Sequence, residues 1–133
     1  MTRDSSPPDL SGATALVIDD DMVVAWGVEE ILRDVGFGTV IIAGSDQSAT
    51  QAGKMARPDL IVCDLDLGDM SKHGLDLLKD IDPQEAVLTV LYTGYAGERT
   101  LRTVEQLRPS ATVLPKPASD AALAATIMRS IVK

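Results

Sequence analysis

Short apolar runs alternate with longer segments of helical periodicity along most of this chain. The most informative run is Leu60–Cys63, which ends abruptly in the carboxylate of Asp64. A continuous apolar run of this length, bounded by turn residues, predicts a strand buried on both faces of a parallel sheet. Four similar runs predict further strands at residues 13–18, 39–43, 86–92 and 111–114.

The segments between these runs have the spacing of amphipathic helices. In Met22–Val35, apolar residues recur every three or four positions, and Gly36 supplies a C-terminal stop. Ser45 or Asp46 can cap the next helix, and Ser119 can cap the last one. The remaining helices are expected at 46–56, 74–81 and 98–107, with Ala49, Ala52, Met55, Leu101 and Val104 facing the core.

This alternation predicts the fold class. We expect an α/β protein with a doubly wound five-stranded parallel sheet, flavodoxin-like (βα)5, in the strand order 2-1-3-4-5. Residues 1–12 are rich in Ser, Pro, Asp and Gly, and we expect them to form a flexible N-terminal segment. The folded domain is therefore predicted at 13–133, which is long enough to bury its own core.

Composition argues against several classes of protein. The net charge of −8 is unfavourable for nucleic-acid binding by this domain and for an anionic membrane surface. No apolar stretch is long enough to span a bilayer, and residues 1–8 are polar and lack the apolar core of a signal peptide. The single cysteine, Cys63, is expected to be a buried core thiol and suits a reducing compartment. We therefore expect a cytoplasmic protein.

Polar side chains follow four of the five predicted strands. The first strand is followed by Asp19 and Asp20, the third by Asp64, the fourth by Thr93 and the fifth by Lys116. Because the first and third strands are neighbours in the expected order, their carboxylates should meet in one crevice, with the hydroxyl and the ammonium group opposite.

Clustered carboxylates of this kind favour a hard divalent cation. Mg²⁺, or Mn²⁺ in its place, takes one or two carboxylates together with waters and phosphate oxygens. A phosphoryl group fits between such a cation and Lys116, and Thr93 can donate a hydrogen bond to one of its oxygens. Asp64, the most central carboxylate, is the candidate nucleophile for an aspartyl phosphate.

With these features the chain resembles the receiver domains of bacterial two-component response regulators over roughly residues 12–133. The resemblance depends on five matched positions at strand ends and not on a single motif. The residues at these five positions are Asp19, Asp20, Asp64, Thr93 and Lys116, and Pro117 directly follows the lysine as in the family.

The resemblance implies a role for each matched position. Asp64 would be the phosphoacceptor. Asp20 and Asp64 would bind Mg²⁺ through their side chains, Asp19 directly or through water, and Asp66 through its backbone carbonyl. Such a domain catalyses at most its own phosphorylation and dephosphorylation, so we do not expect an enzyme.

The resemblance also implies partners and a switch. Lys116 would pair with the carboxylate or the phosphoryl group, Thr93 would be the switch hydroxyl, and the Lys116–Pro117 bond would be cis. The phosphoryl donor would be a phosphohistidine on a histidine kinase or a histidine phosphotransfer protein. The signal would pass through a surface change near the fourth helix and fifth strand to a downstream protein that the sequence does not identify.

Some positions depart from the family pattern. Gly68 replaces a usual proline, and the loop from Asp66 to Gly74 is about two residues longer than is common in the family. Val113 stands where many receivers carry the aromatic residue that moves with the threonine, so switching must use another group, such as Tyr95. We also expect Asp66 and Tyr95 to tune dephosphorylation.

A few residues have both a functional and a structural interpretation. Trp26 lies off the apolar stripe of its helix, and with Met22, Val23 and Pro117 it could form a docking surface for the phosphoryl donor. The alternative is that Trp26 simply covers its own helix. Asp21 is expected to be solvated, and the lone His73 is expected to have no ligand role.

Other functions remain open. Asp64-Leu65-Asp66 matches the Asp-x-Asp of haloacid-dehalogenase-like phosphatases, but here the acidic pair precedes it in the chain. A receiver-like interaction module that never uses phosphate is the other alternative, although the complete set of polar residues disfavours it. A dinucleotide or flavin site is weaker still, because no glycine-rich phosphate loop follows the first strand.

Overall fold

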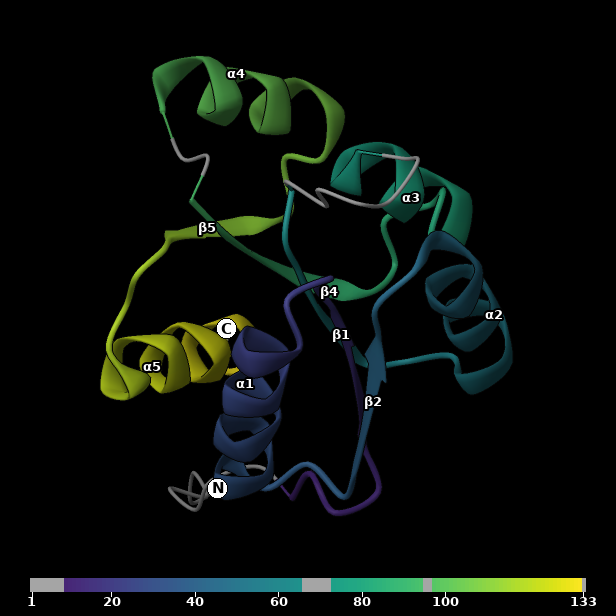
Figure 1. Cartoon of the computed structure of the whole chain (residues 1–133), viewed down its shortest axis with the longest axis vertical. Coiled ribbons are helices and arrows are strands. Elements are labelled where there is room, and N and C mark those ends of the chain that lie inside the picture. The colour runs from purple at the N-terminus through teal and green to yellow at the C-terminus, as the bar shows by residue number, and fades with distance from the viewer. Residues whose placement is uncertain (1–8, 66–72, 95–96, 133) are drawn as a thin grey trace, which may run out of the picture.

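A computed structural model describes residues 9–65, 73–94 and 97–132 of the chain (Figure 1). Strands and helices alternate through these residues, as the sequence predicts. The strands are β1 Thr14–Ile18, β2 Thr39–Ala43, β3 Leu60–Cys63, β4 Leu88–Thr93 and β5 Thr112–Pro115. The helices are α1 Met22–Val35, α2 Asp46–Ala56, α3 Gly74–Ile81, α4 Glu98–Leu107 and α5 Asp120–Ile131.

The strands form one parallel sheet in the order β2-β1-β3-β4-β5, which confirms the predicted topology. The register brings the carboxyl ends of the strands to one edge. Ile18 of β1 is paired with Cys63 of β3, and Thr93 of β4 is paired with Pro115 of β5. The residues that follow these strands therefore start from neighbouring points.

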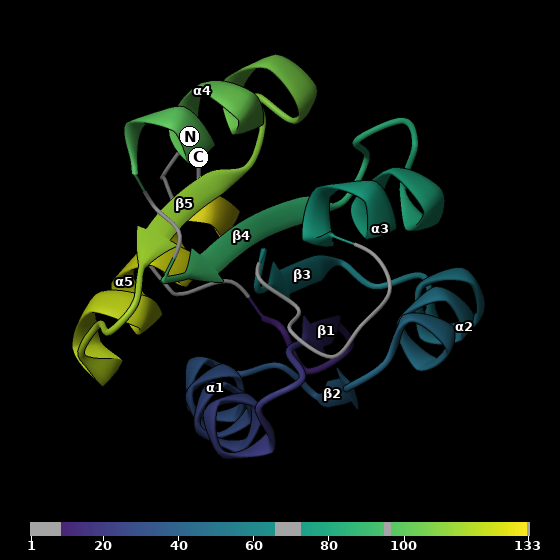
Figure 2. The same ribbon diagram turned by 45° about the horizontal axis from the view of Figure 1, so that its top comes forward.

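Helices cover both faces of the sheet. Figures 1 and 2 show α1 and α5 together on one face, and α2 and α3 on the other. Two apolar cores separate these layers. Val17 and Val62 of the sheet pack with α1 and α5, whereas Leu16 and Ile61 point to the opposite core, which also contains Val104 of α4. All four residues of β3 are buried, as expected for the central strand.

The starts and ends of the helices follow local rules. Ser45 caps α2 and Ser119 caps α5 with side-chain hydrogen bonds, and Gly36 ends α1 with a φ of 126°. Asp21 is exposed, as expected, but it also has a role that was not predicted, because its carboxylate accepts hydrogen bonds from the Val23 and Val24 amides and caps α1. An aspartate one residue before a helix satisfies amides that have no partner within the helix.

Two core predictions are wrong. Met55 is 76% exposed and Leu101 is 45% exposed, whereas Ala49 and Val104 are buried as expected. The buried positions of α2 are Ala49 and Gly53, and a Cβ on Gly53 would come within 2.2 Å of the Ile81 side chain. Close contact between α2 and α3 at a glycine therefore turns the helix away from the orientation that apolar spacing predicts.

The last two strands begin later than predicted. The amides of Ala86 and Val87 donate to the carboxylate of Asp82, at 3.0 Å each, so these residues close a turn before β4 begins. The amide of Ala111 donates to the carbonyl of Arg108 in the same way before β5. These residues are apolar, but their amides are bonded within turns and not within the sheet. Each buried backbone amide needs a hydrogen-bond partner, and here the turn supplies it.

A buried ionic network lies at the amino ends of β4 and β5, away from the carboxyl edge. Arg108 is 3% exposed, and its Nη2 donates to Asp82 Oδ2 at 2.6 Å and to Thr89 Oγ1 at 3.0 Å. Burial alone would raise the pKa of Asp82, but hydrogen bonds from the Val87 and Ala86 amides and from Arg108 hold that pKa below its ordinary value.

Cys63 has the structural role expected of it, whereas the role of His73 as a helix cap was not predicted. Cys63 is fully buried, and its burial raises the pKa of the thiol, which therefore stays protonated and packs as a core residue. His73 is the N-cap of α3, and its Nδ1 accepts a hydrogen bond from the Leu75 amide at 3.2 Å.

In the described part of the chain, no helix has the length and apolar character needed to cross a membrane.

Candidate functional site

Three carboxylates meet at the carboxyl edge of the sheet. Asp19 and Asp20 follow β1, and Asp64 follows β3, which is its neighbour. One oxygen atom from each side chain lies within 4.8 Å of the other two. Asp19 and Asp64 are buried, at 3% and 8% exposure, and Asp20 is half-buried. Mutual repulsion makes such a group costly unless a cation is near.

Backbone hydrogen bonds fix where these carboxylates lie. The amide of Asp19 donates to Ala43 O at 3.2 Å, and the amide of Asp64 donates to Ile18 O at 3.0 Å. These bonds extend the sheet ladder by one residue beyond β1 and β3. The side chain of Asp19 is oriented in addition by the Asp21 amide, which donates to its Oδ1 at 2.9 Å. The acidic cluster is thus built on rigid strands.

Lys116 joins two members of the acidic cluster. Its Nζ lies 2.9 Å from Asp19 Oδ2 and 3.0 Å from Asp64 Oδ2. The lysine follows β5, and its amide donates to the carbonyl of Thr93 at 2.9 Å. The Lys116–Pro117 peptide bond is cis. The ammonium group is therefore held between the first and third strand ends, although it comes from the edge strand.

The surroundings shift the pKa values of two of these groups. Burial raises the pKa of Asp19 above its ordinary value, and hydrogen bonds from the Asp21 amide and Lys116 oppose the shift without cancelling it. Burial alone would lower the pKa of Lys116, but its contacts with Asp19 and Asp64 outweigh burial and raise it. Lys116 is therefore protonated at neutral pH.

Thr93 lies at the carboxyl end of β4, beside β3, and is fully buried. This position puts a hydroxyl-bearing residue on the strand next to β3, which Asp64 directly follows. Val113 of β5, which occupies the position expected for a switch aromatic, is half-buried and packs against the core on the α2, α3 and α4 side. An apolar, β-branched residue here is stiff and has no hydrogen bond to exchange.

Tyr92 contributes a contact that the sequence alone does not indicate. Lys116 Nζ lies 5.4 Å from the centre of its ring, within the range of a cation–π interaction. The phenol oxygen accepts a hydrogen bond from the Ala118 amide at 3.3 Å. Side chains alternate along β4, so Tyr92 points to the sheet face covered by α1 and α5 if Thr93 points to the opposite face. This alternation is the one sequence signal that could have predicted the position of Tyr92.

The donor set fits a hard divalent cation. Three carboxylates offer oxygen atoms, which are the ligands that Mg²⁺ and Mn²⁺ prefer, and the described residues of the cluster include no sulfur or imidazole ligand. The pKa of Asp19 is raised because burial disfavours its charged form. A bound cation would offset the free-energy cost of burying that charge.

The remaining predicted site residues fall into two groups. Asp66, Tyr95 and the loop around Gly68 lie outside the described residues. The predicted docking residues lie at the surface, with exposures of 37% for Met22, 75% for Val23 and 60% for Trp26, and Pro117 is exposed as well.

Comparisons with known proteins point to one family. The family model "Response regulator receiver domain" matches residues 15–128. The probable transcriptional regulatory protein TcrX of Mycobacterium tuberculosis is 41% identical over 78 residues, which are 59% of this chain and 32% of that protein. The DNA-binding response regulator MtrA of Mycobacterium leprae is 35% identical over 78 residues, or 59% of this chain and 33% of that protein. The aligned region is thus about a third of each relative.

Solved structures show the same fold. A CheY-like response regulator receiver domain from Methanospirillum hungatei superposes with a TM-score of 0.78 at 22% identity, covering 90% of this chain and 93% of that one. The chemotaxis response regulator CheY4 of Vibrio cholerae gives a TM-score of 0.77 at 21% identity, covering 89% of this chain and 98% of that one. At this identity the likeness concerns the fold alone.

Proposed function

Because this chain belongs to the response regulator receiver domain family, we propose that Asp64 accepts a phosphoryl group and that the domain is the switch of a two-component system or phosphorelay. One observation carries the proposal. The ammonium group of Lys116 bridges Asp64 and Asp19 within a group of three carboxylates at the carboxyl edge of the sheet. This arrangement holds a nucleophile, a fixed positive charge and cation ligands together.

The proposed chemistry is the transfer of a phosphoryl group from a phosphohistidine. A carboxylate oxygen of Asp64 forms the new O–P bond while the P–N bond breaks, and the departing imidazole nitrogen keeps the electron pair and takes up a proton. Lys116, which holds Asp64 Oδ2, orients the carboxylate and stabilises the negative charge of the transferred group. Phosphoryl donation by a histidine kinase or a histidine phosphotransfer protein belongs to this proposal.

The chain would hold the metal ion through Asp19, Asp20 and Asp64, with the backbone carbonyl of Asp66 as a further proposed ligand. When bound, Mg²⁺ or Mn²⁺ would neutralise charge that develops on the phosphoryl oxygens. The chain's own contribution is to fix the carboxylates on β1 and β3, and to keep them largely out of water.

We propose that Thr93 then donates a hydrogen bond to a phosphoryl oxygen, which makes it the switch hydroxyl. The neighbouring α4 is weakly anchored, because Val104 is its one buried residue. A helix with few buried contacts can shift at small cost, so the surface formed by α4 and β5 is suited to change on phosphorylation. With Val113 in place of an aromatic residue, the change would have to depend on another group, and Tyr95 is the candidate that we propose.

Loss of the phosphoryl group is the other step that this domain would catalyse on itself. We propose that Asp66 and Tyr95 tune the lifetime of the aspartyl phosphate. The Asp66→Ala and Tyr95→Ala variants should change the first-order rate at which the intact phosphorylated mass decays in Mg²⁺. A lifetime equal to that of the wild type in both variants would refute this role.

The decisive experiment is intact-mass spectrometry after incubation with acetyl phosphate and Mg²⁺. The wild type should gain the mass of one phosphoryl group, Asp64→Ala should gain none, and the matched variant of an exposed aspartate, Asp76→Ala, should behave as the wild type. Absence of an adduct under all conditions would favour an interaction module that never uses phosphate. Sustained hydrolysis of a small phosphate ester would instead favour a phosphatase.

A further inference from the structure

A cavity lies between α3 and the end of α4, on the face of the sheet that both helices help to cover. Its volume is about 320 Å³, near the lower end of the roughly 300–1,000 Å³ that is usual for small-molecule sites. Its described lining residues are Leu75, Asp76 and Lys79 of α3, Asp82, Pro83 and Glu85 of the connection to β4, and Leu107 and Arg108 at the end of α4. It is named here the α3–α4 cavity.

The guanidinium group of Arg108, which lines this cavity, has one hydrogen-bond donor without a partner. Its Nη1 donates to the carbonyl oxygen of Asp82 at 3.2 Å, and its Nη2 donates to the Asp82 carboxylate and to Thr89 Oγ1. Its Nε is buried and has no hydrogen-bond partner among the described residues, and Arg108 as a whole is only 3% exposed. A buried N–H that has given up water without gaining another partner costs free energy. An acceptor in the cavity would remove this cost.

Two other polar side chains of the cavity wall are already paired. The carboxylate of Asp82 accepts hydrogen bonds from two backbone amides and from Arg108. The carboxylate of Glu85 accepts a hydrogen bond from Ser110 Oγ at 3.1 Å, and the Glu85 amide donates to the carbonyl of Asp82 at 3.1 Å. These bonds fix the connection between α3 and β4. The group that this wall still needs is therefore an acceptor for Arg108 Nε.

The rest of the lining determines what kind of molecule can carry that acceptor. Leu75, which is 7% exposed, and Leu107, which is 61% exposed, offer apolar surface on the α3 and α4 sides. The charged lining residues are three carboxylates and two basic groups, so an anion would find no excess of positive charge. A neutral molecule with an apolar body and a carbonyl oxygen meets both requirements.

The end of α4 is the part of the cavity wall that can open. Atoms of the protein cover Arg108 Nε, so a ligand has to displace part of the wall to reach it. Val104 is the one buried residue of α4, and Leu107 in its last turn is largely exposed. Because few contacts hold this turn, a small outward shift would admit a ligand at low cost.

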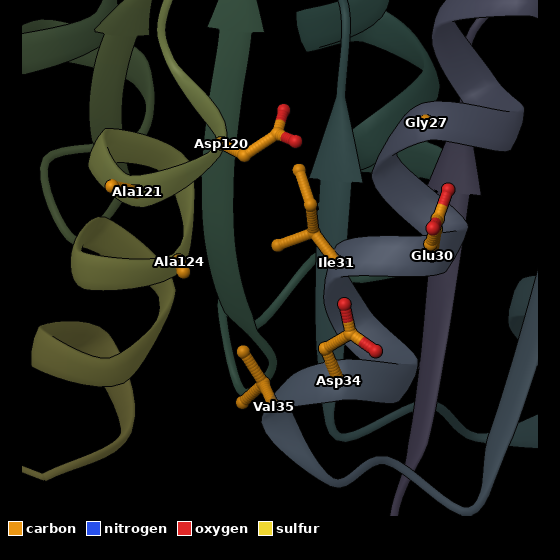
Figure 3. A pocket seen from close by; sticks show the side chains of 8 residues that line it. All are labelled: Gly27, Glu30, Ile31, Asp34, Val35, Asp120, Ala121 and Ala124. Carbon is orange, nitrogen blue, oxygen red and sulfur yellow. The ribbon is translucent and has the colours of Figure 1, made fainter.

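The depression between α1 and α5 is slightly larger, at about 370 Å³, but its polar groups differ from those of the α3–α4 cavity (Figure 3). Its charged lining residues are Glu30, Asp34 and Asp120, and all three are exposed. Exposed carboxylates are hydrated, so they place no requirement on a ligand. The α3–α4 cavity is different because its unpaired donor is buried.

We propose that the α3–α4 cavity binds a small neutral carbonyl compound, whose oxygen accepts a hydrogen bond from Arg108 Nε and whose apolar body packs between Leu75 and Leu107. Burial of apolar surface would supply most of the affinity, and the carbonyl group would supply the selectivity. The inference does not depend on the proposed function, because none of the described lining residues belongs to the carboxylate cluster.

Nuclear magnetic resonance of the complete chain, labelled with ¹⁵N, tests this proposal, because arginine Nε–H groups give signals of their own. The probes are ring compounds, each used as a ketone and as the matching hydrocarbon, with 1-indanone and indane as the first pair. Leu107→Ala removes apolar surface from the cavity. The matched control is Leu101→Ala, since Leu101 is also an exposed leucine of α4 but is not among the described lining residues. Circular dichroism checks that both variants are folded.

At least one ketone should shift the Nε–H signal of Arg108 together with the amide signals of Leu75 and Leu107. Its dissociation constant should be about tenfold lower than that of the matching hydrocarbon. The constant should rise by about threefold for Leu107→Ala and change by less than about 1.5-fold for Leu101→Ala.

Three results would each overturn the proposal. The first is that no ketone of the set shifts the Nε–H signal of Arg108. The second is equal affinity for a ketone and its hydrocarbon, which would show that the cavity recognises apolar surface alone. The third is equal affinity of the ketone for Leu107→Ala and the wild type, which would place the bound molecule elsewhere on the domain.

Discussion

Replacing Lys116 with methionine should destabilise the domain in a way that depends on magnesium. The substitution keeps much of the side-chain volume but removes the ammonium group that lies 2.9 Å from Asp19 and 3.0 Å from Asp64. The acidic cluster then keeps its three carboxylates without the lysine. We therefore expect a loss of folding free energy when no divalent cation is present.

The size of this loss follows from burial. Removing one partner of a fully buried ion pair costs about 3–5 kcal/mol, and an exposed pair contributes about 0–1 kcal/mol. The side chain of Lys116 is 19% exposed and those of Asp19 and Asp64 are 5% and 10% exposed, so the pair is closer to the buried case. Allowing for solvent screening at the lysine, we expect Lys116→Met to lower the free energy of unfolding by about 2–3 kcal/mol in EDTA.

Magnesium should reduce this difference. A ligand at ten times its dissociation constant stabilises the folded state by about 1.4 kcal/mol. Since the variant lacks the competing ammonium group, its carboxylates should bind Mg²⁺ more tightly than those of the wild type and gain more stability from it. The gap between variant and wild type should therefore shrink by about half or more in saturating Mg²⁺.

Urea unfolding in EDTA and in Mg²⁺, followed by circular dichroism and Trp26 fluorescence, measures these differences. Lys54→Met is the matched control, because Lys54 is an exposed lysine on α2 and should change stability by less than about 0.5 kcal/mol. An equal gap between Lys116→Met and the wild type in both solutions would refute the reasoning. So would a loss no larger than that of the control.

Four further outcomes can be checked by the same unfolding measurements. Asp82→Ala should cost about 3–5 kcal/mol, because it leaves the guanidinium group of Arg108 buried at 3% exposure without its carboxylate. Since the pKa of Asp82 is lowered in the folded state, the cost of Asp82→Ala should be constant near neutral pH and should shrink as pH falls below about 4. A cost that grows in acid would contradict a lowered pKa of Asp82. Gly74→Ala should destabilise the domain by more than about 2 kcal/mol and weaken Mg²⁺ stabilisation, because its Cβ would lie 2.6 Å from the carbonyl oxygen of Asp64. Wild-type stability in this variant would refute the expected clash. Met55→Gln should change stability by less than about 0.5 kcal/mol, since Met55 is 76% exposed, and a loss near that of a core methionine would show that it packs inward.

Local sequence patterns were enough to predict most of the fold. The bounds of α1 through α4 are those that the apolar spacing predicts, Ser45 caps α2 as expected, and a run without polar residues indicates the central β3. These predictions succeed because periodicity and capping depend on residues that are close in sequence. The strand order also followed, since alternating strands and helices with right-handed connections leave few topologies.

Sequence and topology together made one part of the candidate site predictable, namely the contact between Lys116 and the acidic cluster. Lys116 and Asp19 are 97 positions apart, yet both follow strands whose carboxyl ends lie at one edge of a parallel sheet. The type of fold therefore converts a distant pair into neighbours. The predicted roles of Asp66 and Tyr95 concern residues outside the described part and stay predictions.

Only the tertiary structure decided the contacts in which packing sets the partner of each residue. Asp82 and Arg108 form a buried ion pair across 26 positions, and no periodic pattern distinguishes them from surface charges. Met55 and Leu101 have helical spacing that favours burial, but the close approach of α2 to α3 and the sparse packing of α4 leave both exposed. The hydrogen bond from the Ala118 amide to the Tyr92 hydroxyl likewise depends on how the segment before α5 lies against β4. Sequence periodicity determines which face of an element is apolar, whereas the distance and angle between elements determine which of those residues find a partner.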